Sequence, residues 1–122
     1  MSLRSELSTS TVIYELMREL GDSALYKNVG GAVQTLKLHP EEESRELAEI
    51  LGVDTEQTAR QFLIPKQTNF PPANGVSMGD QVTYPTGAMY TYECRRWRDV
   101  SGGLGLLFEL DCIRTRPKRI NQ

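Results

Sequence analysis

Leu104-Gly-Leu-Leu-Phe-Glu-Leu-Asp-Cys-Ile-Arg-Thr-Arg116 is the stretch that decides the fold. Apolar residues recur in it with a period of two, which is typical of a β-strand that turns one face toward a core. Ser101-Gly-Gly103 precedes it as a turn signal, so Ala88 to Val100 is expected to form an antiparallel partner strand. The expected core face of the final strand carries Leu106, Phe108, Leu110 and Cys112.

The partner strand contains core-like residues of opposite parity. Tyr92 and Cys94 share one face with Tyr90, whereas Trp97 falls on the other. A regular strand cannot point all of them inward, so we expect a β-bulge near Arg95-Arg96. The turn lies midway between Cys94 and Cys112, which places these two cysteines roughly opposite each other. In a reducing cytoplasm they are interpreted as small buried hydrophobic residues, with a cross-strand disulfide as the alternative.

Four more strands and two helices are expected upstream. A hairpin runs over 24–28 and 32–38 around Val29-Gly-Gly31, a strand over 58–64 ends at Pro65, and a short strand covers 81–84. One helix is expected over 12–20. The other covers 41–51, with Pro40 in its first turn and Leu47, Ile50 and Leu51 on its buried face. The pattern therefore predicts a mainly β (α+β) fold: a small antiparallel β-barrel of about six strands with an N-terminal helix and one inserted helix.

The length of 122 residues fits one domain. We divide it into an N-terminal helical arm (1–22), the barrel with its inserted helix and a long loop at 66–79 (23–116), and a C-terminal tail (117–122). With 39% hydrophobic and 25% charged residues the composition is that of a globular protein. No apolar run approaches the length of a membrane span and no signal peptide is evident, so we expect synthesis in the cytoplasm and no membrane partner.

The net charge of −2 conceals an uneven distribution. Residues 41–56 hold seven acidic side chains against Arg45, whereas residues 95–122 hold seven basic ones against three acidic ones. This pattern indicates either two solvated faces of opposite sign, or head-to-tail assembly or contact with a polyanion.

No pattern for catalysis, metal binding or cofactor binding stands out. His39 is the sole histidine and precedes Pro40 at a strand end, and no Gly-x-Ser-x-Gly sequence is present. Zinc or calcium ligand spacing, a P-loop and a dinucleotide-binding fingerprint are also missing from the sequence. We therefore expect a protein that is not an enzyme and carries no cofactor.

Two alternative functions are considered from local patterns. Residues 45–60 resemble the first helix, turn and start of the recognition helix of a helix-turn-helix DNA-binding regulator. The long loop at 66–79 has no periodicity, and loops of this length are usually functional. It could border the ligand of a small-molecule or peptide-binding barrel.

From Ala59 onward the chain resembles a known family. A strand ending in Ile64-Pro65 leads to Phe70-Pro-Pro72, then Gly79-Asp-Gln-Val82, the Tyr90/Tyr92 strand, and a closing strand that ends Cys112-Ile-Arg-Thr-Arg116. This layout resembles the head-completion (head-tail joining or stopper) proteins of tailed bacteriophages.

The resemblance implies a virion protein at the head-tail interface. Such a protein would assemble with itself as a ring between portal or adaptor and tail proteins, with non-specific contact to packaged DNA. The candidate residues for assembly or DNA-channel contacts are Phe70, Pro71, Pro72, Arg95, Arg96, Arg98, Arg114, Arg116, Lys118 and Arg119.

Overall fold

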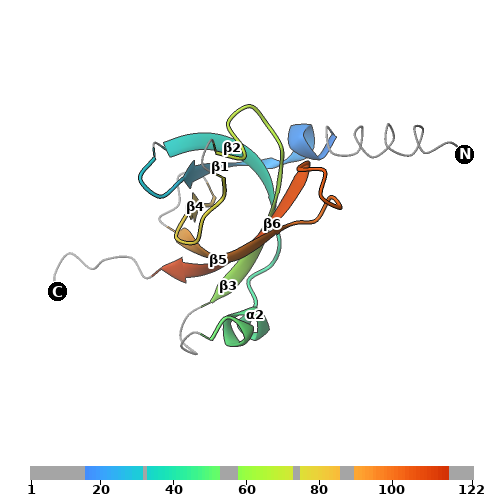
Figure 1. Cartoon of the computed structure of the whole chain (residues 1–122). Helices are drawn as coiled ribbons and strands as arrows, with labels where there is room; N and C mark the ends of the chain where they lie inside the picture. The colour runs from blue at the N-terminus through green and yellow to red at the C-terminus, as the bar shows by residue number, and fades with distance from the viewer. Residues whose placement is uncertain (1–15, 32, 53–57, 73–74, 86–89, 116–122) are drawn as a thin grey trace, which may run out of the picture.

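Six antiparallel strands close into a barrel with the order β1-β2-β3-β6-β5-β4, and β4 pairs with β1 to complete it (Figure 1). The computed structural model describes residues 16–31, 33–52, 58–72, 75–85 and 90–115. The strands are β1 Asp22–Lys27, β2 Val33–Pro40, β3 Ala59–Pro65, β4 Gln81–Thr83, β5 Thr91–Asp99 and β6 Leu107–Thr115. The helix α2 covers Arg45–Ile50, and residues 16–20 are also helical. The predicted fold, a small β-barrel with two short helices, is confirmed.

The pairing of β5 with β6 agrees closely with the sequence prediction. The register shifts between Cys94 and Arg96, which leaves Arg95 as the extra residue of a β-bulge. Cys94 lies directly opposite Cys112, and both thiols are free and buried. Burial, followed by the neighbouring Cys94 thiol, raises the pKa of Cys112. The pair therefore acts as core filling, without a disulfide.

The two ends of these strands differ from the prediction. The turn is wider than Ser101-Gly-Gly103, because residues 101–106 form a bent loop and β6 begins at Leu107. Leu106, expected in the core, lies before the strand and is half-buried. Tyr90 and Trp97, also expected in the core, are 45% and 42% exposed, because they lie near the ends of β5 where the barrel wall stops covering them.

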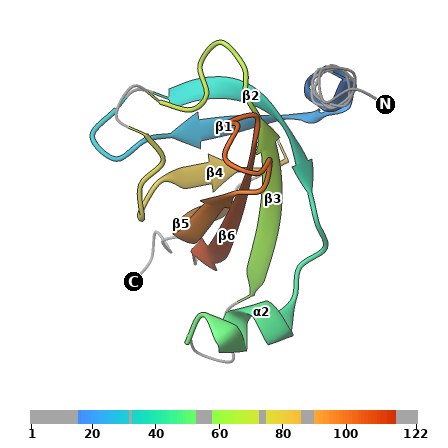
Figure 2. The same ribbon diagram turned by 45° about the vertical axis from the view of Figure 1, so that its right-hand side comes forward.

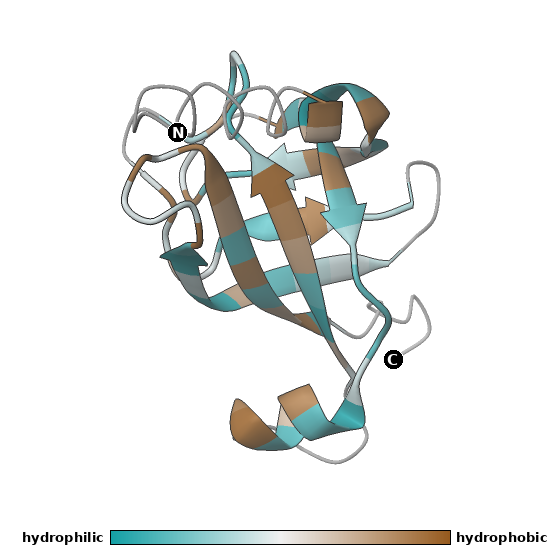
Figure 3. Ribbon diagram, turned by 90° about the vertical axis from the view of Figure 1, so that its right-hand side faces the viewer, coloured by the Kyte–Doolittle hydropathy of each residue, from teal (hydrophilic) through white to brown (hydrophobic). Residues whose placement is uncertain are grey.

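Aromatic rings fill the barrel interior. Tyr26, Phe62, Phe70 and Tyr92 are almost fully buried, together with Leu36, Leu38, Ile64 and Leu110. Ring pairs meet edge to face, with centroids 5.3 Å apart for Tyr26 and Phe70 and 5.2 Å apart for Phe62 and Tyr92. Figure 3 shows the hydrophobic bands that alternate with hydrophilic ones along the strands. Burying such large rings supplies much of the hydrophobic stabilisation of a small barrel.

The inserted helix begins later than predicted. Pro40 belongs to the end of β2, and residues 41–43 stay extended because the ladder to β3 continues through Glu41 N to Gln61 O and Ser44 N to Ala59 O. Ser44 is the N-cap, and its hydroxyl accepts a hydrogen bond from the amide of Leu47. The predicted buried face is also wrong in part, since Ala48 is buried and Ile50 is 66% exposed. Figure 2 shows α2 at one end of β3.

The helical segment 16–20 lies beside β2. The ring nitrogen Nε2 of His39 lies 2.5 Å from the carbonyl oxygen of Met17, and Gly21 packs so closely on Leu38 that a Cβ there would meet the Leu38 backbone at 3.0 Å. Leu16 and Leu20 nevertheless remain 50% and 75% exposed. Across the described part of the chain, the helices are too short and too polar to cross a bilayer.

Candidate functional site

Four of the candidate assembly and DNA contacts that the structure describes are arginines of β5 and β6, and each has a carboxylate partner. The nitrogen-to-oxygen distances are 3.9 Å for Arg95 to Glu93, 2.5 Å for Arg96 to Asp111, 3.0 Å for Arg98 to Glu109 and 3.2 Å for Arg114 to Glu43. The positive charge available to a polyanion is therefore smaller than the sequence count implies. Arg116, Lys118 and Arg119 lie outside the described residues.

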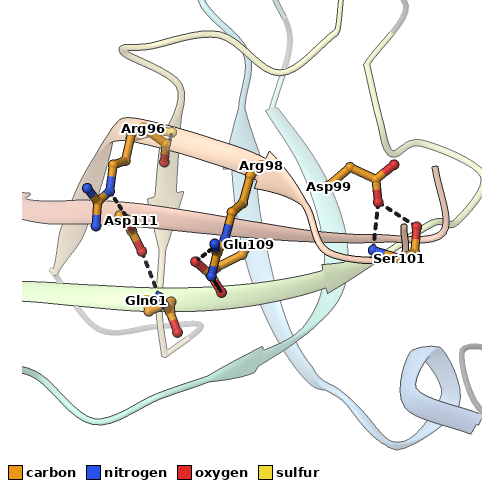
Figure 4. A network of polar contacts seen from close by, with 8 residues as sticks. Gln61, Arg96, Arg98, Asp99, Ser101, Glu109 and Asp111 are labelled. Atoms are coloured by element: carbon orange, nitrogen blue, oxygen red, sulfur yellow. Dashed lines mark hydrogen bonds and ion pairs between the residues drawn. The ribbon is translucent and has the colours of Figure 1, made fainter. Parts of the chain in front are cut away.

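Two of these pairs lie side by side on the outer face of the barrel (Figure 4). The carboxylate of Asp111 accepts from Gln61 Nε2 at 2.8 Å and from Arg96 Nε, whereas Glu109 accepts twice from Arg98, at 3.0 and 3.2 Å. A hollow of about 320 Å³ lies among these side chains and Trp97. Asp111 holds Arg96 through Nε, and Glu109 holds Arg98 through Nε and Nη2. The remaining Nη groups form the outer edges of the two guanidinium groups and are left to meet an anion.

The Arg114 pair belongs to a second cluster at the end of the barrel near Glu43. Glu43 Oε1 accepts from Arg114 Nη1 and also from the Tyr92 hydroxyl, at 2.7 Å. Burial and then the Glu43 hydrogen bond raise the pKa of Tyr92. Arg60 lies over the Tyr84 ring, 5.0 Å from its centroid, and Arg60 Nε donates to the Glu41 carbonyl at 2.6 Å. These contacts tie residues 41–43 to the barrel wall.

The three candidate contact residues in the long loop, Phe70, Pro71 and Pro72, differ in how exposed they are. Phe70 is fully buried against Tyr26 and Phe108, so it is a core residue and not a surface contact. Its apolar ring fills space at the end of the barrel, which a Phe-Pro-Pro pattern in a loop does not reveal. Pro71 is exposed, Pro72 is half-buried, and both line a hollow of about 280 Å³. The other residues around it are Tyr26, Asn28, Gly31, Gln34, Thr68 and Asn69.

Asp80, directly after the long loop, has a structural role that the sequence analysis did not assign. Its side chain is fully buried and accepts from the Tyr26 hydroxyl and the Asn28 amide. The backbone amides of Val29 and Ser77 also donate to it, each at 2.9 Å. Burial, and then the hydrogen bond to Asp80, raise the pKa of Tyr26. This carboxyl group fastens residues 75–80 to the end of β1, and the Gly79-Asp80 pair was its signal in the sequence.

The carboxyl group of Asp99 organises the loop between β5 and β6. Asp99 accepts from the amide and hydroxyl of Ser101, at 2.8 and 2.5 Å (Figure 4). It also accepts from the amide of Gly105, at 2.8 Å. The Ser101 hydroxyl is the largest cause that lowers the pKa of Asp99. The loop is thus shaped by its own polar contacts.

The helix-turn-helix interpretation of residues 45–60 does not fit the structure. Residues 59 and 60, where a recognition helix would continue, belong to β3. The guanidinium group of Arg60 lies over aromatic rings. Ala59 and Arg60 pair with β6, opposite Ile113 and Cys112.

In comparisons with known proteins, no family model, curated protein or solved structure matches the chain. Among the described residues, no group of three or more His, Cys, Asp or Glu side chains could hold a metal ion.

Proposed function

We propose that this chain is a structural protein of a tailed-phage virion, without enzymatic activity, that assembles as a ring in the head-tail connector. Its partners are further copies of itself, the portal or adaptor protein, and tail proteins. Contact with packaged DNA, where it occurs, is non-specific and uses the outer edges of Arg96 and Arg98. The resemblance described above suggests this role, and the closed, filled barrel is compatible with a rigid building block.

The exposure of Leu16 and Leu20 is the observation that carries the proposal. These residues are one helical turn apart, so their side chains share one face of the segment 16–20. Both are at least half exposed, although the segment is held against β2 through Met17 and His39. An apolar helix face that is anchored but uncovered favours contact with another chain.

Surface charge supports the same proposal. Glu41, Glu42, Glu46 and Glu49 are exposed around α2, whereas Lys27, Lys37 and Lys66 are exposed elsewhere and form no ion pair with a described residue. Separate surfaces of different charge favour heterologous contacts, in which one patch meets another patch on the next copy, and such contacts close into rings.

Mass photometry and electron microscopy of the purified chain test the proposal, with and without the portal protein encoded in the same genome. We expect a monomer alone and a closed ring when the portal is added. The double variant Leu16→Glu/Leu20→Glu is expected to stay monomeric with the portal. Ile50→Glu is the control, because it makes the same kind of substitution at an exposed apolar residue of α2 and adds one negative charge, and it should still form the ring.

Two outcomes would contradict the proposal. One is a chain that stays monomeric with portal, adaptor and tail proteins at every concentration. The other is a compact dimer that binds duplex DNA with sequence selectivity, which would favour a regulator.

A further inference from the structure

The seam between β2 and β3 is short and leaves part of β2 without a neighbour. The two strands pair at His39↔Leu63 and Pro40↔Phe62. Toward its other end β2 continues from Val33 to Leu38, still paired with β1. Among the residues that the structure describes, no strand pairs with that part of β2 on the side facing away from β1.

The hydrogen bonds of Lys37 show which backbone groups point to this side. Its N–H donates to Gln67 Oε1 and its carbonyl accepts from Gln67 Nε2, both at 2.9 Å, so an amide side chain takes the place of a strand. Backbone groups of alternate residues point the same way in a strand. Val33 and Thr35 therefore direct their N–H and C=O groups to the same side as Lys37. Neither residue has a partner there within the described chain, and both are exposed.

The hollow lined by Pro71 and Pro72 lies next to this free edge. Gln34, between the two unpaired residues, contributes to its wall, and so does Tyr26, which pairs with Gln34. Its volume of about 280 Å³ is enough for one or two medium-sized side chains. A strand laid against Val33–Thr35 would direct every second side chain toward the barrel interior, and so into this hollow.

The charge around the edge is positive. Lys27, Lys37 and Lys66 are exposed, and none of them forms an ion pair with a described residue. Lys37 is on β2 itself, Lys27 lies opposite Val33, and Lys66 precedes Gln67. None of the residues that line the hollow is charged. This arrangement contrasts with the arginines of β5 and β6, which all have carboxylate partners.

We propose that the β2 edge at Val33–Thr35 binds an extended acidic segment of a partner protein by strand addition. Backbone hydrogen bonds to Val33 and Thr35 hold the segment, an uncharged side chain of the segment fills the hollow, and its acidic residues meet the three lysines. The inference does not rest on the phage role, because it follows from the free edge, the hollow and the lysines alone.

Amide hydrogen exchange by NMR, with a defined peptide as the probe, tests this inference. The probe is a capped peptide of alternating glutamate and valine, about eight residues long. We expect it to slow exchange of the Val33 and Thr35 amides about tenfold at saturation. The amides of Gln34 and Leu36, which already donate to β1, should change little. A control peptide with every backbone nitrogen methylated keeps charge and side chains but loses the donors on both edges, and it should not bind.

Charge variants give the second measurement. Lys37→Glu/Lys66→Glu should weaken binding of the peptide about tenfold or more at low salt, because the side chains at both positions are then negative and repel the acidic peptide. Arg45→Glu in α2 reverses one positive charge at an exposed residue that follows the Pro40 end of β2, away from Val33–Thr35, and should change the affinity less than about twofold.

Several results would overturn the inference. These are equal binding of the methylated peptide, protection confined to other residues, or unchanged affinity in the lysine variant. Protection of Val33 and Thr35 that rises with protein concentration in the absence of peptide would also overturn it, because a second copy would then occupy the edge.

Discussion

Asp80 and Asp111 are both almost completely buried aspartates, yet their surroundings differ. Asp80 gathers four donors, a phenol, an amide side chain and two backbone amides, and none of them is a cation. Asp111 has Gln61 and the guanidinium of Arg96, which is itself half exposed. The first carboxyl group joins a loop to a strand, whereas the second holds a surface side chain in position. Removing the first should therefore damage the fold, and removing the second should mainly release an arginine.

Asp80→Ala is expected to have the largest effect. It leaves the Tyr26 hydroxyl, the Asn28 amide and two backbone amides without their acceptor in the interior, so we expect a loss of about 4 kcal/mol in the free energy of unfolding. Urea unfolding followed by far-ultraviolet circular dichroism measures it. Asp80→Asn should lose nearly as much, because its NH₂ group would face donors; stability close to that of the original chain would contradict this account.

Asp111→Ala should cost less, about 1–2 kcal/mol. Arg96 can turn toward water once its partner is gone, and the Gln61 amide is the group left partly buried. The same urea measurement applies, with Arg96→Ala as the control. If Asp111→Ala destabilised the chain as much as Asp80→Ala, the contrast between the two carboxyl groups would fail.

At alkaline pH, ionisation of Tyr26 should reduce the stability that its contact with Asp80 gives the fold. Burial and Asp80 raise the pKa of Tyr26 above its ordinary value, so the folded chain keeps a proton that the unfolded chain releases above pH ~10. The stability from this source is complete below that pH and declines as the pH rises further. Urea midpoints between pH ~8 and ~11 measure the decline, and Tyr26→Phe should make it shallower. An unchanged slope in that variant would exclude Tyr26 as the cause.

Glu109→Ala should have the smallest effect. Its partner Arg98 is exposed and held by surface hydrogen bonds, and such pairs add little to stability. We expect no measurable change in the urea midpoint. A clear loss would indicate that the pair stabilises the outer face more than exposed ion pairs do.

The sequence was sufficient for features that local patterning controls. The parity conflict between Cys94 and Trp97 predicted the bulge, and the glycine turns placed the hairpins. The sequence was insufficient where the structure of a segment depends on residues that are distant in the chain. Residues 41–43 look like a helix start until β3 is known to pair with them, and Gln67 gives no sign that its side chain completes a strand edge.

The candidate site was harder to predict for the same reason. Counting charges identified the arginines of β5 but not their carboxylate partners, since Asp111 and Glu109 become neighbours of Arg96 and Arg98 only through the register. Asp80 was visible as part of Gly79-Asp80, but its role depends on Asn28 and Tyr26, more than fifty residues earlier.

The bulge at Arg95 has a consequence for how the length of this chain can vary. Deleting one residue from a regular strand moves every later side chain to the opposite face. Deleting Arg95 would not have this effect, because Cys94 and Arg96 already pair with the consecutive residues Cys112 and Asp111. A chain shortened there keeps Trp97, Arg98 and Asp99 opposite their present partners. The bulge is thus a point at which one residue can be removed without moving the later side chains of β5 to the opposite face.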